Sequence, residues 1–328
     1  MTLIEAKHIS KDFVVQRDWL GRPKKVLTAV HDLSLTIGEG ETVGLVGESG
    51  CGKSTFARTL LGLYAKTGGT ISYKGKDVSD AAVGRDYRRH VQMIFQDPYA
   101  SLDPRMTVED IISEPLRNYH LCADDGQRRQ RVASLLEQVD MRPEAAQRYP
   151  HEFSGGQRQR IGIAKALSLN PSLLVCDEPV SALDVSIQAQ ILNLLKNLQK
   201  ELDLTSIFIG HGLGAVNYVS DRIAVMYLGQ IVELADSREL FDHPLHPYSK
   251  ALFDAVPLAD PRTRKRLGGG VIEGEAEILP GPGEGCPFYP RCPRRSRECS
   301  AAKMELRPAS EGSSHLVSCI HAGQEGVD

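Results

Sequence analysis

The sequence predicts an α/β fold followed by a small C-terminal extension that carries cysteines. Strand-like and helical patterns alternate from residue 2 to about residue 235, which is typical of a parallel sheet covered by helices on both faces. After about residue 240 the composition shifts toward proline, glycine and charge, and four of the seven cysteines lie in the last 43 residues. The chain therefore divides into one large domain and an appendage.

Two kinds of pattern indicate the strands. Leu33, Leu35 and Ile37 alternate with polar residues, as expected for a strand with one buried face. Short apolar runs and strand signals mark residues 42–46, 172–176, 206–209 and 223–227. The run at 172–176 suits a strand that is buried on both faces.

Helical spacing appears between these strands. Val132, Leu135, Leu136 and Val139 follow the i, i+3, i+4, i+7 spacing of an amphipathic helix, and a similar stripe runs from residue 187 to 202. A helix pattern also covers residues 56–61. Beyond the large domain, a short helix is expected near residues 249–256, after a turn broken by prolines. Residues 260–282 are interpreted as a linker or extended segment. The basic run 262–266 is interpreted as solvated linker, with a basic recognition patch as the alternative.

Composition and charge exclude several classes of function. The chain has 328 residues, of which 41% are hydrophobic and 25% charged, so neither bulk disorder nor a fibrous fold is expected. The formal charge of −3 argues against a general nucleic-acid binder. The sequence has neither an apolar stretch of about 18 residues nor the pattern of a signal peptide. We therefore expect a cytoplasmic protein that meets a membrane only through partners.

The strongest chemical signal is a glycine-rich loop, GESGCGKST, at residues 47–55. It fits the pattern G-x-x-x-x-G-K-S/T between a predicted strand and a predicted helix, which is the context that a phosphate-binding loop requires. Backbone N–H groups and the helix N-terminus attract phosphate. Lys53 would reach the β- and γ-phosphates, and Ser54 would offer its hydroxyl to Mg²⁺. The predicted ATP-binding residues of this loop are Gly47, Ser49, Gly50, Cys51, Gly52, Lys53, Ser54 and Thr55.

An acidic pair follows the buried strand pattern at residues 172–176. Such a strand would deliver Asp177 and Glu178 to its carboxyl end, where ligands bind in open α/β sheets. Asp177 would hold Mg²⁺, directly or through water, and Glu178 would orient and polarise the attacking water. Taken alone, the pair would read equally as an acidic turn, and the phosphate loop favours the catalytic interpretation.

A second anion site is predicted at the start of a later helix. Ser154 is a good N-cap, and Gly155 and Gly156 expose backbone N–H groups before Gln157. A purely structural helix would also favour serine here, so this signal depends on its context.

Together these motifs resemble those of ATP-binding cassette (ABC) ATPases over residues 3 to about 235. The Ser154-Gly155-Gly156-Gln157 signature is the most specific of them, because other P-loop ATPases lack it. The resemblance implies a helical subdomain at about residues 100–165. It also implies two cassettes that sandwich two ATP molecules, each signature contacting the γ-phosphate held by the other cassette. The two anion sites of one chain would then serve different nucleotides.

The resemblance assigns roles to four further residues. Gln96 matches the glutamine that senses Mg²⁺ and γ-phosphate, Asp184 matches the D-loop aspartate at the dimer interface, and His211 matches the switch histidine. Phe13 matches the aromatic that stacks on adenine, with a core aromatic as the alternative. One departure is Gly212, where relatives carry aspartate. Because the glycine removes an N-cap and loosens the backbone, we expect less rigid γ-phosphate sensing.

The tail resembles the C-terminal extension of peptide-importer ATPases, of the F type. The matching segments are residues 246–252, 285–293 and 314–319. The resemblance implies a nucleotide-binding domain at residues 3–240 and an extension at 241–328. Nickel and glutathione importers use similar subunits, so the solute stays open.

The tail cysteines are candidate metal ligands. They are separated by 5, 6 and 19 residues, unlike the paired cysteines of zinc ribbons. The resemblance implies a 4Fe–4S cluster, with zinc, or free or disulfide-linked cysteines, as alternatives. The four candidate ligands are Cys286, Cys292, Cys299 and Cys319. We interpret Cys51 and Cys176 as small apolar fillers.

The resemblance as a whole implies an ATP-hydrolysing subunit that energises peptide import. Its expected partners are two integral membrane permease subunits, a second and different ATP-binding subunit of the D type, and indirectly an extracytoplasmic peptide-binding protein. Its expected place is peripheral, on the cytoplasmic face of the inner membrane. A soluble ABC ATPase acting on ribosomes or DNA is the alternative, and the single uninterrupted cassette argues against it. A regulatory cassette that binds ATP without hydrolysis is disfavoured by Glu178 and His211.

Overall fold

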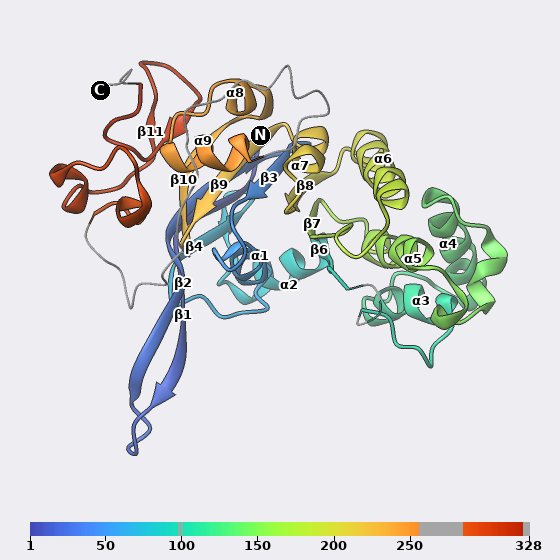
Figure 1. The fold of residues 1–328 in the computed structure, drawn as a ribbon. Helices are drawn as coiled ribbons and strands as arrows, with labels where there is room; N and C mark the ends of the chain where they lie inside the picture. Colours follow the sequence, from blue (N-terminus) through green and yellow to red (C-terminus); the bar gives the residue numbers. More distant parts are fainter. Residues whose placement is uncertain (98, 100, 256–284, 324–328) are drawn as a thin grey trace. The chain divides into compact units, whose positions relative to one another are not determined.

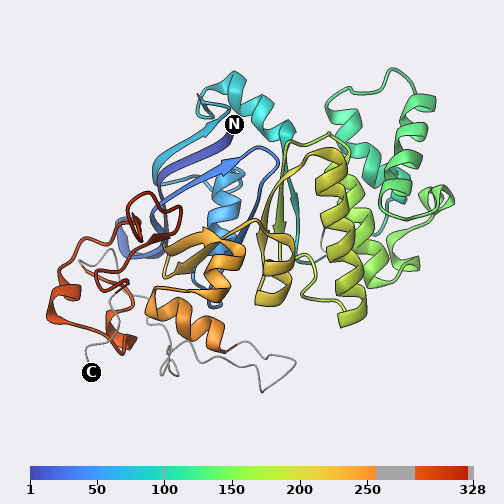
Figure 2. The same cartoon turned by 90° about the horizontal axis from the view of Figure 1, so that it is seen from above.

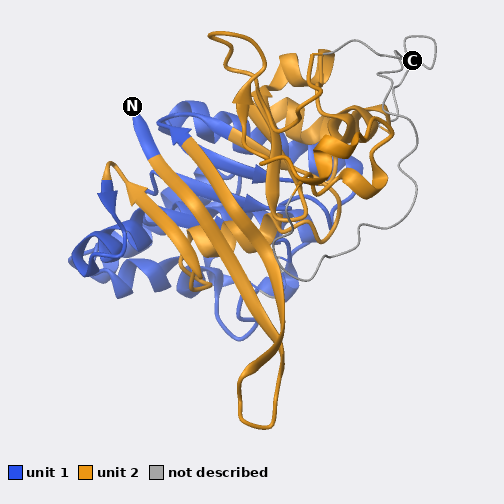
Figure 3. Cartoon of the chain, turned by 90° about the vertical axis from the view of Figure 1, so that its left-hand side faces the viewer, with its two compact units in different colours: residues 1–3, 37–42, 76–210 blue, residues 4–36, 43–75, 211–328 orange. Residues whose placement is uncertain are grey.

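The computed structural model describes residues 1–97, 99, 101–255 and 285–323. Packing divides the chain into two compact units, shown in Figure 3. Unit 1 comprises residues 1–3, 37–42 and 76–210, and unit 2 comprises residues 4–36 and 43–75 with the described residues from 211 onward. The domain boundary near residue 240 stays a prediction, and the linker predicted at 260–282 lies outside the described residues.

Three parallel strands form the sheet of unit 1. In spatial order they are β6 (Val91–Ile94), β7 (Leu173–Asp177) and β8 (Thr205–Ile209). Every residue of β7 and β8 is buried, which explains their continuous apolar runs. Because the strands are parallel, their carboxyl ends meet at one edge of the sheet, and that edge carries the residues that follow β6 and β7.

Helices make up most of the rest of unit 1. The predicted amphipathic helices are confirmed as α4 (Asp125–Gln138) and α6 (Val185–Leu202), and Val132, Leu135 and Leu136 are buried. Helices α3 (Val108–Asn118), α4 and α5 (Gly155–Leu167) pack against one another, as the green helices in Figure 2 show. The smaller elements are β5 (Lys76–Asp77), α2 (Ala81–His90) and the 3₁₀ helices η1 (Pro143–Gln147) and η2 (Pro150–Glu152).

Unit 2 contains a sheet that is mixed rather than wholly parallel. Strand β3 (Thr42–Val46) is parallel to β9 (Arg222–Tyr227), but β10 (Gln230–Asp236) runs antiparallel to β9. The reason is a two-residue turn, in which Leu228 and Gly229 have φ angles of 42° and 83°. Two central residues with positive φ are typical of the tight hairpin turn that joins antiparallel strands. Two short strands, β12 (Leu316–Val317) and β11 (Arg307–Pro308), continue the sheet from β10.

A second sheet in unit 2 contains β2 (Pro23–Gly38), β1 (Thr2–Arg17) and β4 (Gly68–Tyr73), in that order, as Figure 1 shows. The predicted alternation on β2 is confirmed, since Leu33, Leu35 and Ile37 are at most 3% exposed. The remaining elements of this unit are α1 (Lys53–Leu60), α7 (Leu213–Val219), α8 (Ser237–Asp242), α9 (Pro247–Asp254), η4 (Tyr289–Arg291) and η5 (Arg297–Ser300). Across the described residues, no helix combines the length and the apolar character needed to span a membrane.

Candidate functional site

The glycine-rich loop of unit 2 connects β3 to α1 and requires glycine for steric reasons. Gly47, Gly50 and Gly52 have φ angles of 151°, 78° and 105°. A Cβ atom at Gly47 would lie 2.1 Å from the Met226 carbonyl oxygen, and one at Gly52 would lie 2.2 Å from the Ala29 carbonyl oxygen. The loop therefore approaches neighbouring backbone more closely than any side chain permits.

Lys53 places a buried positive charge inside this loop. The residue is 4% exposed, and its Nζ donates hydrogen bonds of 2.8 Å to the carbonyl oxygens of Gly47 and Glu48. Lys53 is also the first residue of α1, whose first turn has no acidic side chain. Ser54 and Thr55 follow on that turn and are half-buried. An ammonium group and a helix N-terminus thus converge at the loop, which suits an anionic phosphate.

In unit 1, Gln96 and Glu178 meet at the carboxyl edge of the sheet. The Gln96 Nε2 donates a 2.7 Å hydrogen bond to Glu178 Oε2. Glu178 is 7% exposed and has a φ angle of 52°, which is strained for a residue with a Cβ. Its backbone N–H is fixed by the Ile209 carbonyl oxygen at 3.0 Å. Asp177, the last residue of β7, is 1% exposed. The predicted site residues here come together, and the Gln96–Glu178 hydrogen bond is a contact that the sequence did not reveal.

The signature residues occupy the N-terminus of α5. Ser154 is the N-cap, and it forms a reciprocal capping box in which Gln157 N–H donates to Ser154 Oγ and Ser154 N–H donates to Gln157 Oε1. Ser154 and Gln157 are exposed. They line a cleft of about 940 Å³. Its charged lining residues are three arginines (Arg142, Arg148 and Arg160) and two acidic residues (Asp140 and Glu144), so cationic side chains are in excess.

Gly156 of the signature packs too closely against the start of α6 to carry a side chain, and the space beside Gly155 is tight. A Cβ at Gly156 would lie 2.5 Å from Ile187 Cγ2, and one at Gly155 would lie 3.3 Å from Leu183 Cδ2. Asp184 precedes α6 as its N-cap and makes no capping hydrogen bond with its side chain. Asp184 and Val185 are exposed, and Val185 is 82% exposed.

Two predicted residues of unit 2 lie at less constrained positions. His211 is exposed and precedes Gly212, which is the N-cap of α7 without a side-chain hydrogen bond. Phe13 on β1 is half-buried, so it does not belong to the core. Its ring meets the edge of Tyr64 with centroids 5.4 Å apart, and the Lys11 Nζ lies 4.7 Å from the Phe13 centroid.

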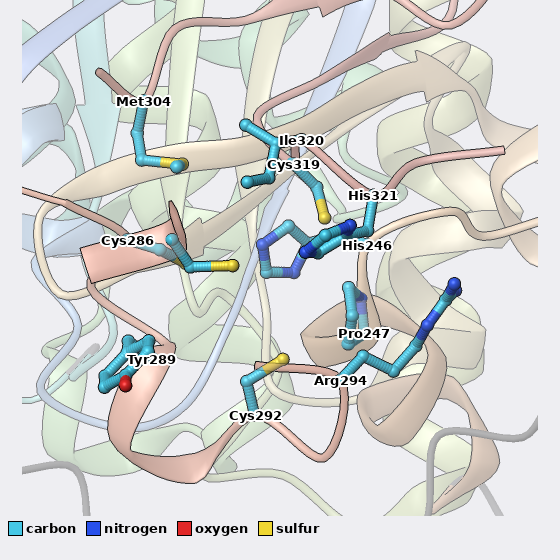
Figure 4. Close-up of a pocket in the computed structure, with 11 residues that line it drawn as sticks. His246, Pro247, Cys286, Tyr289, Cys292, Arg294, Met304, Cys319, Ile320 and His321 are labelled. Atoms are coloured by element: carbon cyan, nitrogen blue, oxygen red, sulfur yellow. The ribbon is translucent and has the colours of Figure 1, made fainter. Parts of the chain in front are cut away.

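The four tail cysteines of unit 2 line one small cavity together with His246, His321 and Met304. Figure 4 shows the sulfurs of Cys286, Cys292 and Cys319 directed toward the same space. The free volume is about 10 Å³, which is near the minimum for one water molecule. All seven cysteines of the chain lie in the described ranges, and each is free of a disulfide.

Burial dominates the electrostatics of these thiols. It raises the pKa of Cys286 to about 12 and also raises the pKa values of Cys292 and Cys319, with repulsion from the neighbouring tail cysteines adding to the effect. Within the described ranges, no group of three or more His, Cys, Asp or Glu side chains is arranged to hold a metal ion. Cys51 and Cys176 are buried at 4% and 2% exposure, in agreement with apolar fillers.

The predicted site residues are therefore divided between the units. Unit 2 holds Phe13, the glycine-rich loop, His211 and the tail cysteines. Unit 1 holds Gln96, the signature, Asp177, Glu178 and Asp184.

Two family models match the chain. Residues 30–181 match a family described as ABC transporter, and residues 232–299 match one described as the oligopeptide/dipeptide transporter C-terminal region.

Known proteins are similar to the chain over almost its whole length. The oligopeptide transport ATP-binding protein OppF of Salmonella typhimurium is 50% identical over 97% of this chain and 96% of its own. The oligopeptide transport ATP-binding protein AppF of Bacillus subtilis is 46% identical over 97% of each chain. Among solved structures, a dimeric ATP-binding cassette in a post-hydrolysis state with bound ADP and Pi matches with a TM-score of 0.64. It is 27% identical, and the match covers 72% of this chain and 99% of that one.

Proposed function

This chain belongs to the ABC transporter family, among the oligopeptide transport ATP-binding proteins, and we propose that it hydrolyses ATP to drive the import of oligopeptides through a membrane transporter. The observation that carries the proposal is the glycine-rich loop with its buried lysine. Lys53 is held inside a loop that admits only glycine at two positions, and this arrangement has a specific use in binding a polyphosphate.

The residues of the ATP site would divide the chemistry as follows. The loop N–H groups and Lys53 would hold the β- and γ-phosphates and offset the charge that develops during transfer. Ser54, Gln96 and Asp177 would hold Mg²⁺, which supplies charge neutralisation between the phosphates when bound. Phe13 would stack on the adenine, which fits its half-buried position on β1.

Glu178 would align and polarise the attacking water. Its carboxylate accepts a 2.7 Å hydrogen bond from Gln96 Nε2, which fixes the direction of the side chain. Because phosphoryl transfer depends mainly on positioning and charge, a carboxylate held in this way is suited to orient water. His211 would contact the γ-phosphate from the loop after β8.

The signature would act on the nucleotide of a second cassette. Ser154 and Gln157 are exposed at the N-terminus of α5, and arginines outnumber acidic residues in the lining of the adjoining cleft. The exposed Asp184 and Val185 at the start of α6 offer polar and apolar contacts for a partner. The partner cassette is proposed to be a different, D-type subunit, with each chain supplying a signature to the other's ATP.

The transporter would contain two integral membrane permease subunits, supplied with solute by an extracytoplasmic peptide-binding protein. This chain would sit peripherally on the cytoplasmic face of the inner membrane.

Co-purification after co-expression with two permease subunits and a second ATPase subunit tests this placement. The expected result is a complex with two permeases and a second ATPase, whose ATP turnover rises with peptide-loaded binding protein. If only nickel or glutathione stimulated ATP turnover, that solute would take the place of peptide in the proposal. Co-sedimentation of the chain with ribosomes or DNA, without a transporter complex, would refute the importer role.

The four tail cysteines are proposed to hold a 4Fe–4S cluster. They line one cavity without disulfides, and thiolate sulfur is the usual ligand of iron in such clusters. Gaps of 5, 6 and 19 residues separate them, unlike the closely paired cysteines of zinc ribbons, and this spacing disfavours zinc. When bound, the cluster would cross-link the tail, which contains little regular secondary structure of its own.

Iron and labile sulfide analysis of anaerobically purified protein tests the cluster. Cys286→Ser and Cys292→Ser are expected to lose the iron, whereas the matched control Cys122→Ser, in unit 1 and far along the chain from the tail, should retain it. Stoichiometric zinc without sulfide, or iron content unchanged in both tail variants, would contradict the assignment.

A further inference from the structure

Glu48, the second residue of the glycine-rich loop, is held by the C-terminal part of the chain. Its backbone N–H donates a 2.8 Å hydrogen bond to the hydroxyl of Tyr248 on α9. Its carboxylate accepts two hydrogen bonds from Arg291, at 2.9 Å from Nη1 and 3.1 Å from Nη2. Its carbonyl oxygen accepts from Lys53 at 2.8 Å. Both the backbone and the side chain of one loop residue are therefore fixed from outside the loop.

Arg291 is well placed to fix this residue. The pair is bidentate, which gives it directional as well as electrostatic strength, and the Arg291 side chain is only 10% exposed. The Arg291 Nη1 also donates to the Tyr227 hydroxyl at 3.3 Å. The backbone of Arg291 closes the short helix η4 with a hydrogen bond to Phe288, and Cys292 follows immediately. The arginine is thus anchored beside the cysteine cavity.

An aromatic cluster stabilises the contact between the C-terminal part of the chain and Glu48. Phe288 and Tyr248 are fully buried, and their ring centroids lie 5.5 Å apart. Tyr227, at the end of β9, contacts both rings, with centroid separations of 4.7 Å from Tyr248 and 5.3 Å from Phe288. Packed aromatic rings hold their positions with little freedom. A displacement of the tail would therefore reach Tyr248 and Arg291 together.

The chemistry of the loop explains why Glu48 needs such partners. A carboxylate in a loop that binds a triphosphate repels the ligand unless its charge is compensated. The guanidinium of Arg291 compensates that charge and keeps the carboxylate directed to the tail. The Tyr248 hydroxyl accepts from the Glu48 N–H, so this loop N–H is not available to phosphate.

We propose that Arg291 and Tyr248 are positioning residues for the phosphate-binding loop, and that docking of the C-terminal extension sets the affinity for ATP through Glu48. The inference rests on the ATP site proposed above. A purely structural ion pair would alter the thermal stability of the protein but leave ATP affinity unchanged.

The test measures equilibrium binding of a fluorescent ATP analogue to the full-length chain. Arg291→Gln leaves a partly buried carboxylate unpaired, and we expect affinity to fall about tenfold or more. The double variant Glu48→Gln/Arg291→Gln removes the stranded charge and should bind within about threefold of the wild type. The defect of Arg291→Gln should shrink at high salt, because ions screen the repulsion.

Matched variants separate the possible failures. Arg295→Gln removes another arginine of the same tail, whose side chain donates to the Pro290 carbonyl oxygen, and it should bind like the wild type. Lys53→Ala should abolish binding. Analogue binding that persists in Lys53→Ala would refute the proposed ATP site rather than this inference.

If Arg291→Gln does not fold, Tyr248→Phe and Arg291→Lys replace it, because each keeps most of the packing. Both are expected to weaken binding severalfold. The inference is overturned if Arg291→Gln, or both replacement variants, bind ATP as tightly as the wild type. It is equally overturned if the double variant is no better than Arg291→Gln alone.

Discussion

Replacing Gly156 by alanine is expected to destabilise unit 1, although alanine is the better helix former. The added Cβ would lie 2.5 Å from Ile187 Cγ2, whereas ordinary contacts begin near 3.4 Å. Helix α5 or α6 would have to yield by roughly 1 Å. Overpacking of this kind costs about 1–3 kcal/mol, and the gain in helix propensity offsets at most about 1 kcal/mol.

Gly162 provides a matched control in the same helix. A Cβ at that position meets no atom within 4 Å, so Gly162→Ala should gain stability by about 0.5–1 kcal/mol. Thermal unfolding followed by circular dichroism distinguishes the variants, since about 1 kcal/mol shifts the Tm of a chain of 328 residues by about 1.5 °C. We expect a lower Tm for Gly156→Ala and a higher one for Gly162→Ala.

The double variant Gly156→Ala/Ile187→Ala tests the contact itself. Removing the Ile187 side chain relieves the overlap, so the cost of the alanine at Gly156 should largely disappear in that background. Because Ile187 lies on the first turn of α6, next to Asp184, the single variant should also lower ATP turnover. A Gly156→Ala protein as stable as Gly162→Ala would refute the reasoning.

Further predictions concern two other positions. His315 is 2% exposed, with Nε2 2.7 Å from Glu233 Oε1 and Nδ1 3.1 Å from Glu239 Oε1. Burial lowers its pKa, but these hydrogen bonds outweigh burial and leave the pKa raised above 6.5. The protonated His315 therefore contributes its full stabilisation below pH 6.5, and this contribution is lost as the pH rises through the raised pKa of the folded protein. The urea concentration at the midpoint of unfolding should fall over that pH range in the wild type and change less in His315→Gln. Gly212→Asp should supply the missing N-cap of α7 and raise stability by about 0.5 kcal/mol with a changed ATPase rate, and an unchanged Tm and rate would contradict the expected loosening at His211.

Much of the fold could be predicted from the sequence, because several strands and helices have a hydrophobic spacing that identifies them without tertiary contacts. Strand β3 was predicted with its observed bounds, and α6 differs from its predicted range by two residues at the start. The antiparallel β10 was missed. Its hairpin turn uses Leu228 and Gly229, and leucine rarely adopts a positive φ, so no turn signal was visible.

Contacts between distant residues were beyond the reach of the sequence. Gln96 and Glu178 are 82 positions apart, and Glu48 and Arg291 are 243 apart. No local pattern pairs these residues with each other, so only the pairing of β6 with β7, or the docking of the tail, brings the partners together. The motifs predicted which residues carry chemistry, whereas the tertiary contacts that hold those residues had to come from the structure.

The central claim, that Glu178 orients the water for ATP hydrolysis, is tested most directly by the turnover of Glu178→Gln. The amide keeps the shape of the side chain but cannot act as a carboxylate, so ATP should bind normally while hydrolysis falls on the order of 10²-fold or more. Measuring ATP affinity and phosphate release on the same purified transporter separates binding from chemistry. The predicted result is an unchanged affinity for ATP together with slow phosphate release. Phosphate release at a near-normal rate would show that Glu178 does not have this catalytic role.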